Sequence, residues 1–209
     1  MTPNLKNYAM ILEKVENKTA KYVGTRYAVA CSSGRNAVRF SLLALGIGRH
    51  DEVVIPDFTC QILPITVICT GASPRFCDID RETCALSPTR LPEVLRPNTK
   101  AVIFIHPYGL PVDPTPIIEE TERRGIFCVD DASQALGASI NGKKAGSFGD
   151  VGILSFRKLL NVNLGGAVTT DDKELAAKIK SIRAKYEQKS FFTSFGYGLM
   201  KNCGLKSKN

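Results

Sequence analysis

Lys158 and the acidic pair Asp130 and Asp131 are residues whose types and positions could support chemistry. Lys158 follows a short apolar run and precedes the paired glycines Gly165 and Gly166. A lysine at a strand end, with a flexible turn behind it, is suited to form an imine with a carbonyl compound. The acidic pair ends an earlier apolar run, where a carboxylate could pair with a protonated ring nitrogen. An imine-forming lysine and a strand-end carboxylate are two requirements of a pyridoxal phosphate enzyme.

Both residues also have simpler interpretations. The neighbouring Arg157, together with partial burial, would lower the pKa of Lys158 and favour the neutral amine that attacks a carbonyl, but a single lysine is usually a solvated surface residue. Asp131 could instead cap a helix that begins at Ala132. Of the acidic pair, Asp130 is the expected cap or surface residue. The residues alone leave these alternatives open.

A glycine turn at Ser33, Gly34 and Arg35 lies between a predicted strand and a predicted helix. Backbone N–H groups and the helix dipole converge at such a turn and can bind a phosphate. The segment lacks the GxGxxG and GxxxxGK[ST] patterns of dinucleotide sites and P-loops, so it also fits an ordinary glycine turn. Ser155, shortly before Lys158, could donate a hydroxyl to a phosphate or could be a small polar residue of the sheet.

Alternating strand and helix patterns must position these residues. Short apolar strand patterns alternate with helical patterns. Strands are predicted at 26–31, 51–56, 74–80, 101–106 and 126–131, with helices at 59–70 and 114–124 among the segments between them. Short connections between such elements favour an α/β fold with a mostly parallel sheet covered by helices on both faces. Ligands of such sheets bind beyond the carboxyl ends of the strands. The site is therefore expected at that edge.

Two further local patterns give predictions. Asp171 and Glu174 form a capping-box pattern at the start of the last clear helix. His106 ends an apolar run, so we expect it on the rim of the site, in a loop hydrogen bond. Neither His106 nor His50 has a partner at metal or catalytic-triad spacing, so no metal site is predicted.

The composition is that of a globular protein with one sizeable core, since 44% of the 209 residues are hydrophobic. The formal charge of +8 is spread along the chain without a nucleic-acid motif, which favours a solvated basic surface or an anionic small substrate. The N-terminus lacks the apolar block of a signal peptide, so a cytoplasmic location is expected. The seven cysteines show no CxxC spacing and are expected to be reduced.

The order of the segments is specific. The chain carries, in this order, SSGRNAV, GASPRFCDID, TKAVIFIHPYGLPVD, VDDASQALGA and SFRKLLNVNLGGAVTTDD. Over residues 26–185 this arrangement resembles the DegT/DnrJ/EryC1/StrS family of pyridoxal phosphate-dependent sugar aminotransferases. The resemblance implies the aspartate aminotransferase-like fold (fold type I), with a cofactor-binding large domain at residues 1–185. Residues 186–209 would begin the connection to a C-terminal small domain that is absent.

The resemblance also assigns roles at the two ends of the cofactor. Gly34 and Arg35 match positions whose backbone N–H groups hold the phosphate, and Ser155 matches the serine that adds a hydroxyl.

At the ring, Asp131 matches the partner of the pyridine nitrogen, Gln134 the residue beside the ring hydroxyl, and Lys158 the lysine that forms the Schiff base. The chain departs from the family in two places near the ring. Cys60 stands where many members place a stacking aromatic residue, and the segment between Ser155 and Lys158 is shorter than usual.

By this resemblance, the chain is a transaminase that moves an amino group from glutamate or a similar donor to a keto-sugar nucleotide, in amino-sugar or cell-surface polysaccharide biosynthesis, as a homodimer. A lysine rather than a histidine at position 158 argues against dehydration chemistry. The alternative is a truncated or regulatory fragment that binds pyridoxal phosphate, or nothing, without turnover. The end of the chain is expected to leave an apolar surface uncovered around Phe191, Phe192, Phe195 and Tyr197 and to favour association.

Overall fold

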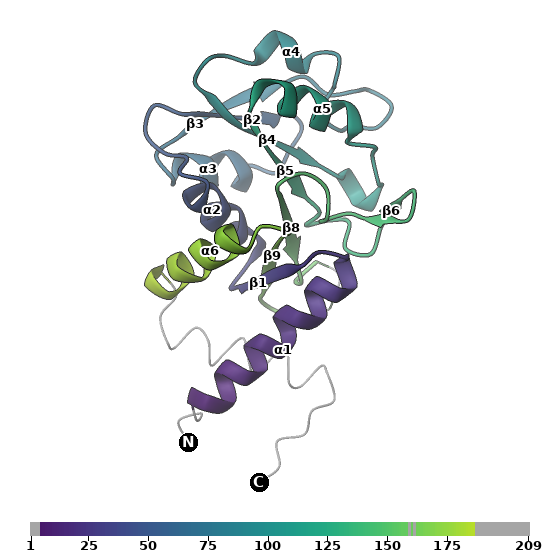
Figure 1. The fold of residues 1–209 in the computed structure, drawn as a ribbon. Coiled ribbons are helices and arrows are strands. Elements are labelled where there is room, and N and C mark those ends of the chain that lie inside the picture. The colour runs from purple at the N-terminus through teal and green to yellow at the C-terminus, as the bar shows by residue number, and fades with distance from the viewer. Residues whose placement is uncertain (1–4, 159, 161, 187–209) are drawn as a thin grey trace.

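A mixed, mostly parallel sheet forms the centre of the molecule. A computed structural model describes residues 5–158, 160 and 162–186, and its seven-stranded sheet has the order β1-β9-β8-β5-β4-β2-β3 (Figure 1). The five strands from β8 to β3 run parallel to one another, whereas β9 is antiparallel to both β8 and β1. The strands span Tyr27–Cys31 (β1), Glu52–Pro56 (β2), Ser73–Cys77 (β3), Thr99–Ile105 (β4), Phe127–Asp131 (β5), Val151–Ser155 (β8) and Gly166–Thr170 (β9), and a separate hairpin joins Ser139–Ile140 (β6) to Lys143–Lys144 (β7).

Helices cover both faces of this sheet (Figure 1), which confirms the predicted α/β class. They span Leu5–Val23 (α1), Gly34–Ala44 (α2), Ile62–Ile68 (α3), Leu91–Val94 (α4), Thr115–Arg124 (α5) and Lys173–Tyr186 (α6). Successive strand residues point to opposite faces, so Ile153 packs in the core under α2, α3 and α6, whereas Leu154 packs in the core that includes Val23 of α1. A third core lies under α4 and α5 around Phe104. All five residues of β8 are buried, as expected of a strand covered on both sides.

Two helix starts differ from the sequence predictions. Asp171 does not cap α6; its carboxylate accepts a hydrogen bond from the Arg26 backbone N–H at 2.7 Å. Asp172 is the cap instead, because it directly precedes the helix and accepts from the N–H groups of Glu174 and Leu175 at 2.7 and 3.1 Å. The helix predicted over 59–70 is shorter, since α3 begins only at Ile62.

The outer edge of β1 is closed by side chains from two helices. Glu16 of α1 is buried and accepts a hydrogen bond from the Ala30 backbone N–H at 3.1 Å. Arg183 of α6 donates to the Ala30 carbonyl at 2.9 Å and to the Glu16 carboxylate at 2.6 Å, and Lys180 Nζ lies 2.9 Å from the same carboxylate. These contacts satisfy the outward backbone groups of Ala30, which an unpaired edge strand would expose.

Three other features expected from the sequence concern the cysteines, membrane-spanning helices and the aromatic residues near the end of the chain. Six cysteines lie in the described part of the chain, and all six are free thiols. No helix in the part of the chain that the structure describes is long and apolar enough to cross a membrane. The aromatic residues at 191, 192, 195 and 197 lie outside the described residues.

Candidate cofactor site

A cavity of about 350 Å³ lies beyond the carboxyl ends of β1, β5 and β8. Its wall contains five of the six residues predicted to bind the cofactor, namely Gly34, Arg35, Asp131, Ser155 and Lys158. These residues come from three segments that are far apart in the sequence. The sheet order brings them together, because β5, β8 and the strand before α2 all end at this edge.

The start of α2 forms one end of the cavity. Ser33 is the N-cap and accepts from the Asn36 N–H at 3.2 Å. A Cβ atom on Gly34 would lie 3.1 Å from both Ser133 Oγ and Ser155 Cβ, so only a glycine leaves this position open beside two serines. Free N–H groups of a helix start next to hydroxyl groups fit a phosphate. Ser133 was not predicted, because it reaches this place only through the fold.

The paired glycines support this helix start from behind. Gly165 has φ of +119° and donates its N–H to the Ser32 carbonyl at 2.9 Å. A Cβ atom on Gly166 would lie 2.7 Å from the Gly34 nitrogen and 2.5 Å from the Leu154 carbonyl oxygen. The glycine pair therefore provides a left-handed turn and a close backbone approach, both of which exclude other residues.

Asp131 borders the cavity at the end of β5. One of its carboxylate oxygens accepts from the Ser133 backbone N–H at 2.9 Å, but no helix follows at Ala132, so the helix-cap interpretation is wrong. Burial raises the pKa of Asp131, the hydrogen bonds from Ser133 and the charge of Lys158 lower it, and the charge of Asp130 raises it further. A desolvated carboxylate of this kind is stabilised by a cation, and a protonated pyridine nitrogen would provide one.

Lys158 lies in the turn that follows β8, beside Arg157, and both line the cavity. The side chain of Lys158 is exposed, so the partial burial expected from the sequence is wrong. The reason is that β8 ends at Ser155 and the chain has left the sheet by position 158. Cys60 also lines the cavity and is exposed, and it occupies the position where the family resemblance implies a ring-stacking residue.

Gln134 is the one predicted residue that is not on the cavity wall. It is half-buried, and its side-chain oxygen accepts from the Tyr108 backbone N–H at 3.2 Å. Gln134 thus joins the segment after β5 to the turn Pro107–Gly109 that follows β4.

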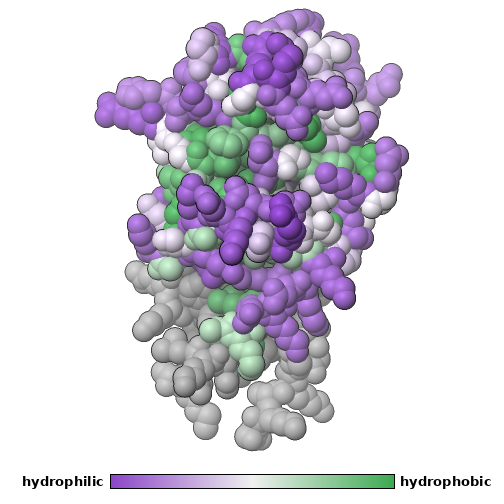
Figure 2. Space-filling model, in the orientation of Figure 1, coloured by the Kyte–Doolittle hydropathy of each residue, from purple (hydrophilic) through white to green (hydrophobic). Residues whose placement is uncertain are grey.

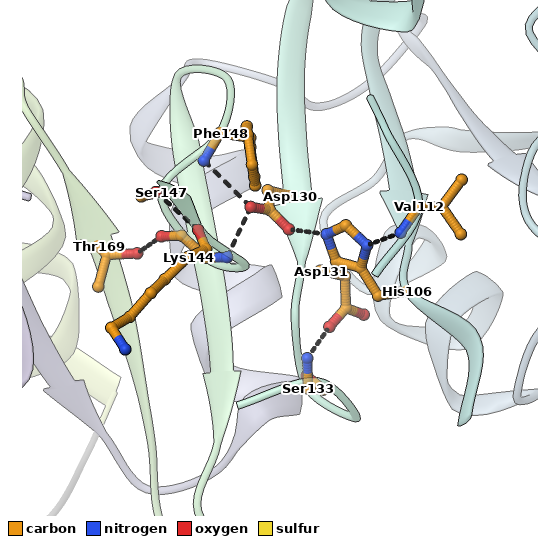
Figure 3. Close-up of polar contacts among 10 residues, drawn as sticks. His106, Val112, Asp130, Asp131, Ser133, Lys144, Ser147, Phe148 and Thr169 are labelled. Carbon is orange, nitrogen blue, oxygen red and sulfur yellow. Dashed lines mark hydrogen bonds and ion pairs between the residues drawn. The ribbon is translucent and has the colours of Figure 1, made fainter. Parts of the chain in front are cut away.

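Asp130 is not the surface or cap residue that the sequence suggested. It is fully buried and accepts three hydrogen bonds, from His106 Nε2 at 3.1 Å, from the Gly146 N–H at 2.6 Å and from the Phe148 N–H at 3.1 Å (Figure 3). His106 is also fully buried rather than on the rim, although it does take a loop hydrogen bond, from the Val112 N–H to Nδ1 at 3.1 Å. The strand alternation explains the error, because it turns Asp130 away from the cavity that Asp131 borders.

Comparisons with known proteins identify the family of the chain. The model of the DegT/DnrJ/EryC1/StrS aminotransferase family matches residues 6–208. The chain is 38% identical to the GDP-perosamine synthase of Caulobacter vibrioides, over 81% of this chain and 46% of that protein. It is also 38% identical to the UDP-N-acetyl-3-dehydro-alpha-D-glucosamine 3-aminotransferase of Acidithiobacillus ferrooxidans, over 81% of this chain and 47% of that protein.

Solved structures give the same result. DesV of S. venezuelae, solved with a ketimine intermediate, has a TM-score of 0.82 and 31% identity, over 93% of this chain and 56% of that one. NtdA of Bacillus subtilis, solved with the cofactor PMP, has a TM-score of 0.78 and 29% identity, over 93% of this chain and 48% of that one. The chain spans about half the length of the relatives it matches, 46% and 47% for the two named above. The family match covers nearly the whole chain, and the chain belongs to the DegT/DnrJ/EryC1/StrS aminotransferase family.

Proposed function

We propose that this chain is the cofactor-binding part of a pyridoxal phosphate-dependent aminotransferase. It would move an amino group from glutamate or a similar donor to a keto-sugar nucleotide. The observation that carries the proposal is that the start of α2, Asp131 and Lys158 all line one cavity. The substrate class is supported by the names of two relatives, a GDP-perosamine synthase and a UDP-sugar 3-aminotransferase.

Each end of the cofactor would meet different chemistry. The N–H groups at Gly34 and Arg35 would bind the phosphate, and the hydroxyl groups of Ser155 and Ser133 would complete its surroundings. Asp131 would accept a hydrogen bond from the protonated ring nitrogen and keep the ring cationic.

When bound, pyridoxal phosphate supplies a carbonyl group that takes up the amine and a ring that draws electrons from the reacting carbon. Lys158 would hold the cofactor covalently through Nζ and then use the released amine to take a proton from that carbon and return it. The Ser133 N–H would keep the Asp131 carboxylate oriented meanwhile, since it already donates to it.

A homodimer in the cytoplasm stays a prediction, and the surface beside the cavity supports the dimer. α3 lines the cavity with Ile62 and Leu63 but exposes Ile65 and Ile68, at 47% and 58%. Figure 2 shows apolar surface at the level where α3 lies in Figure 1. A second copy of the chain could cover this apolar surface. Sedimentation of the purified chain measures its oligomeric state.

Covalent capture tests the cofactor assignment. Pyridoxal phosphate is added to the purified chain, the adduct is reduced with borohydride, and the labelled peptide is identified by mass spectrometry. We expect the label on the peptide that contains Lys158 and no label in Lys158→Ala. Lys173→Ala, which removes an exposed lysine outside the cavity, is the matched control and should label like the parent. Labelling of Lys158→Ala at the parent's level and on another lysine would refute the assignment.

A further inference from the structure

A buried polar network lies at the end of β5 around Asp130, whose side chain points in a different direction from that of the cavity-lining Asp131 (Figure 3). Its centre is the carboxylate of Asp130, which receives donors from the end of β4 and from the loop before β8. That loop is held in turn by β9, because Thr169 Oγ1 donates to the Gly146 carbonyl. The network therefore fastens the end of β5 to segments on both of its sides.

The hydrogen bonds of His106 indicate which of its two ring nitrogens carries the proton. Val112 donates its backbone N–H to Nδ1, so Nδ1 must be unprotonated and the ring proton is assigned to Nε2, which donates it to Asp130. The first of these bonds closes the loop 106–112 onto its own first residue. The second attaches the closed loop to the end of β5.

Two predicted cofactor contacts depend on the segments that this network holds. Asp131 directly follows Asp130, and its carbonyl accepts the His106 backbone N–H at 3.5 Å. Gln134 is held by the loop through the Tyr108 N–H. The turn Pro107–Gly109 packs closely against Gln134, because a Cβ atom on Gly109 would lie 3.1 Å from the Gln134 carbonyl oxygen. Within this turn, Tyr108 has the left-handed φ of +54°.

We propose that Asp130 and His106 are positioning residues, which fix the Asp131 carboxylate at the cavity and hold the turn Pro107–Gly109 against Gln134. Neither residue lines the cavity, so both act through their neighbours. The inference rests on the proposed function only where it treats Asp131 and Gln134 as cofactor contacts.

Asparagine at position 130 is a sharp probe, because it keeps the shape of the side chain. Its amide oxygen can accept from Gly146 and Phe148, but its NH₂ group then faces the Nε2–H of His106. Moving the ring proton to Nδ1 removes that conflict and creates another one with the Val112 N–H. With either tautomer of His106, one buried N–H donor therefore faces another N–H donor.

The test measures amide hydrogen exchange on the purified chain without cofactor. In Asp130→Asn, we expect the backbone amides of Ser133 and Tyr108 to exchange about tenfold faster than in the parent. The rates are compared after correction for the difference in the free energy of global unfolding between variant and parent. The control is Asp150→Asn, which removes the same charge at the other end of β5, where Asp150 accepts from the Cys128 N–H at 2.8 Å. The control should leave both amides protected. Equal protection of these amides in the two variants would overturn the proposal.

A second variant keeps the proposal testable if Asp130→Asn does not fold. His106→Gln retains an N–H donor for Asp130 but provides no acceptor in the place of Nδ1. It should speed exchange at Val112 and Tyr108 more than at Ser133, and uniform changes at all three amides would contradict the proposed roles.

A third measurement separates this proposal from the proposed function. With pyridoxal phosphate bound, the circular dichroism of the cofactor absorption band should be weaker in Asp130→Asn than in Asp150→Asn. The reason is that a less firmly positioned Asp131 lets the cofactor ring adopt more than one orientation. A parent chain that captures no cofactor on Lys158 would refute the proposed function, and the exchange result on the cofactor-free chain would still decide the positioning roles.

Discussion

Asp130 and Asp131 are neighbours on one strand, yet their surroundings differ in nearly every respect. Asp130 is fully buried and accepts hydrogen bonds from three different residues, whereas Asp131 borders the cavity and is hydrogen-bonded by its near neighbour Ser133. The two side chains point in different directions in Figure 3. A carboxylate that the protein itself satisfies holds segments together, and a carboxylate that is desolvated with few donors is suited to a cationic ligand.

Asp131→Asn should have the largest effect on the proposed reaction and little effect on the fold. An amide at this place cannot hold the ring nitrogen in its charged form, and charge-assisted hydrogen bonds contribute about 1.5–3 kcal/mol. We therefore expect the reaction of the cofactor-loaded chain with glutamate to slow by about a hundredfold. Single-turnover kinetics measure this rate, with cofactor binding partly retained. Equal rates in variant and parent would remove Asp131 from the mechanism.

Asp130→Asn should show the opposite pattern, with a loss of stability as its main effect. One buried donor left facing another costs about 2 kcal/mol, so the urea midpoint should fall at an unchanged slope. Asp131→Asn, measured in parallel without cofactor, should be at least as stable as the parent, because burial disfavours the charge at that position. Equal losses in the two variants would contradict the division of roles between the neighbours.

The smallest predicted effect is on the pH dependence of stability without cofactor. Burial raises the pKa of Asp131 in the folded chain, so the folded state binds this proton more tightly than the unfolded state does. The contribution of Asp131 to stability is then fully present below its unfolded pKa and is lost as the pH rises through the folded pKa. The free energy of unfolding of the parent, minus that of Asp131→Asn, should fall across this interval. A flat difference would show that the carboxylate is better solvated than its surroundings indicate.

Local pattern in the sequence was enough to predict several residues of the cavity wall, but it missed residues that reach their places through distant contacts. Asp131 ends an apolar run and Gly34 begins a helix, so their places could be inferred from the alternation of elements and from the family resemblance. Lys158 was predicted in the same way, although it lies in the turn after β8 and not at the strand end itself. The partners of Asp130 come from β4 and from the loop before β8, and no local pattern reports such contacts. Ser133 likewise gains its place only because β5 ends near the start of α2.

Helix starts show the same limit at short range. Asp171 and Asp172 are both suitable caps by type, and the choice depends on where β9 ends and on the Arg26 N–H that Asp171 accepts. Because Arg26 precedes β1 and Asp171 follows β9, the contact requires the pairing of those two strands. The local sequence pattern therefore located the start of α6 correctly but named Asp171 as the cap in place of Asp172.

The closed edge at β1 has a consequence for the order in which the chain folds. β1 is the first strand in the sequence, and its sheet partner is β9, the last described strand. Glu16 and Ala30 are close in sequence and can meet early, but Arg183, which completes the edge, comes from the last described helix. Contacts between distant parts of a chain form slowly because a long loop must close first. On the ribosome, the first strand to emerge is thus among the last to be completed.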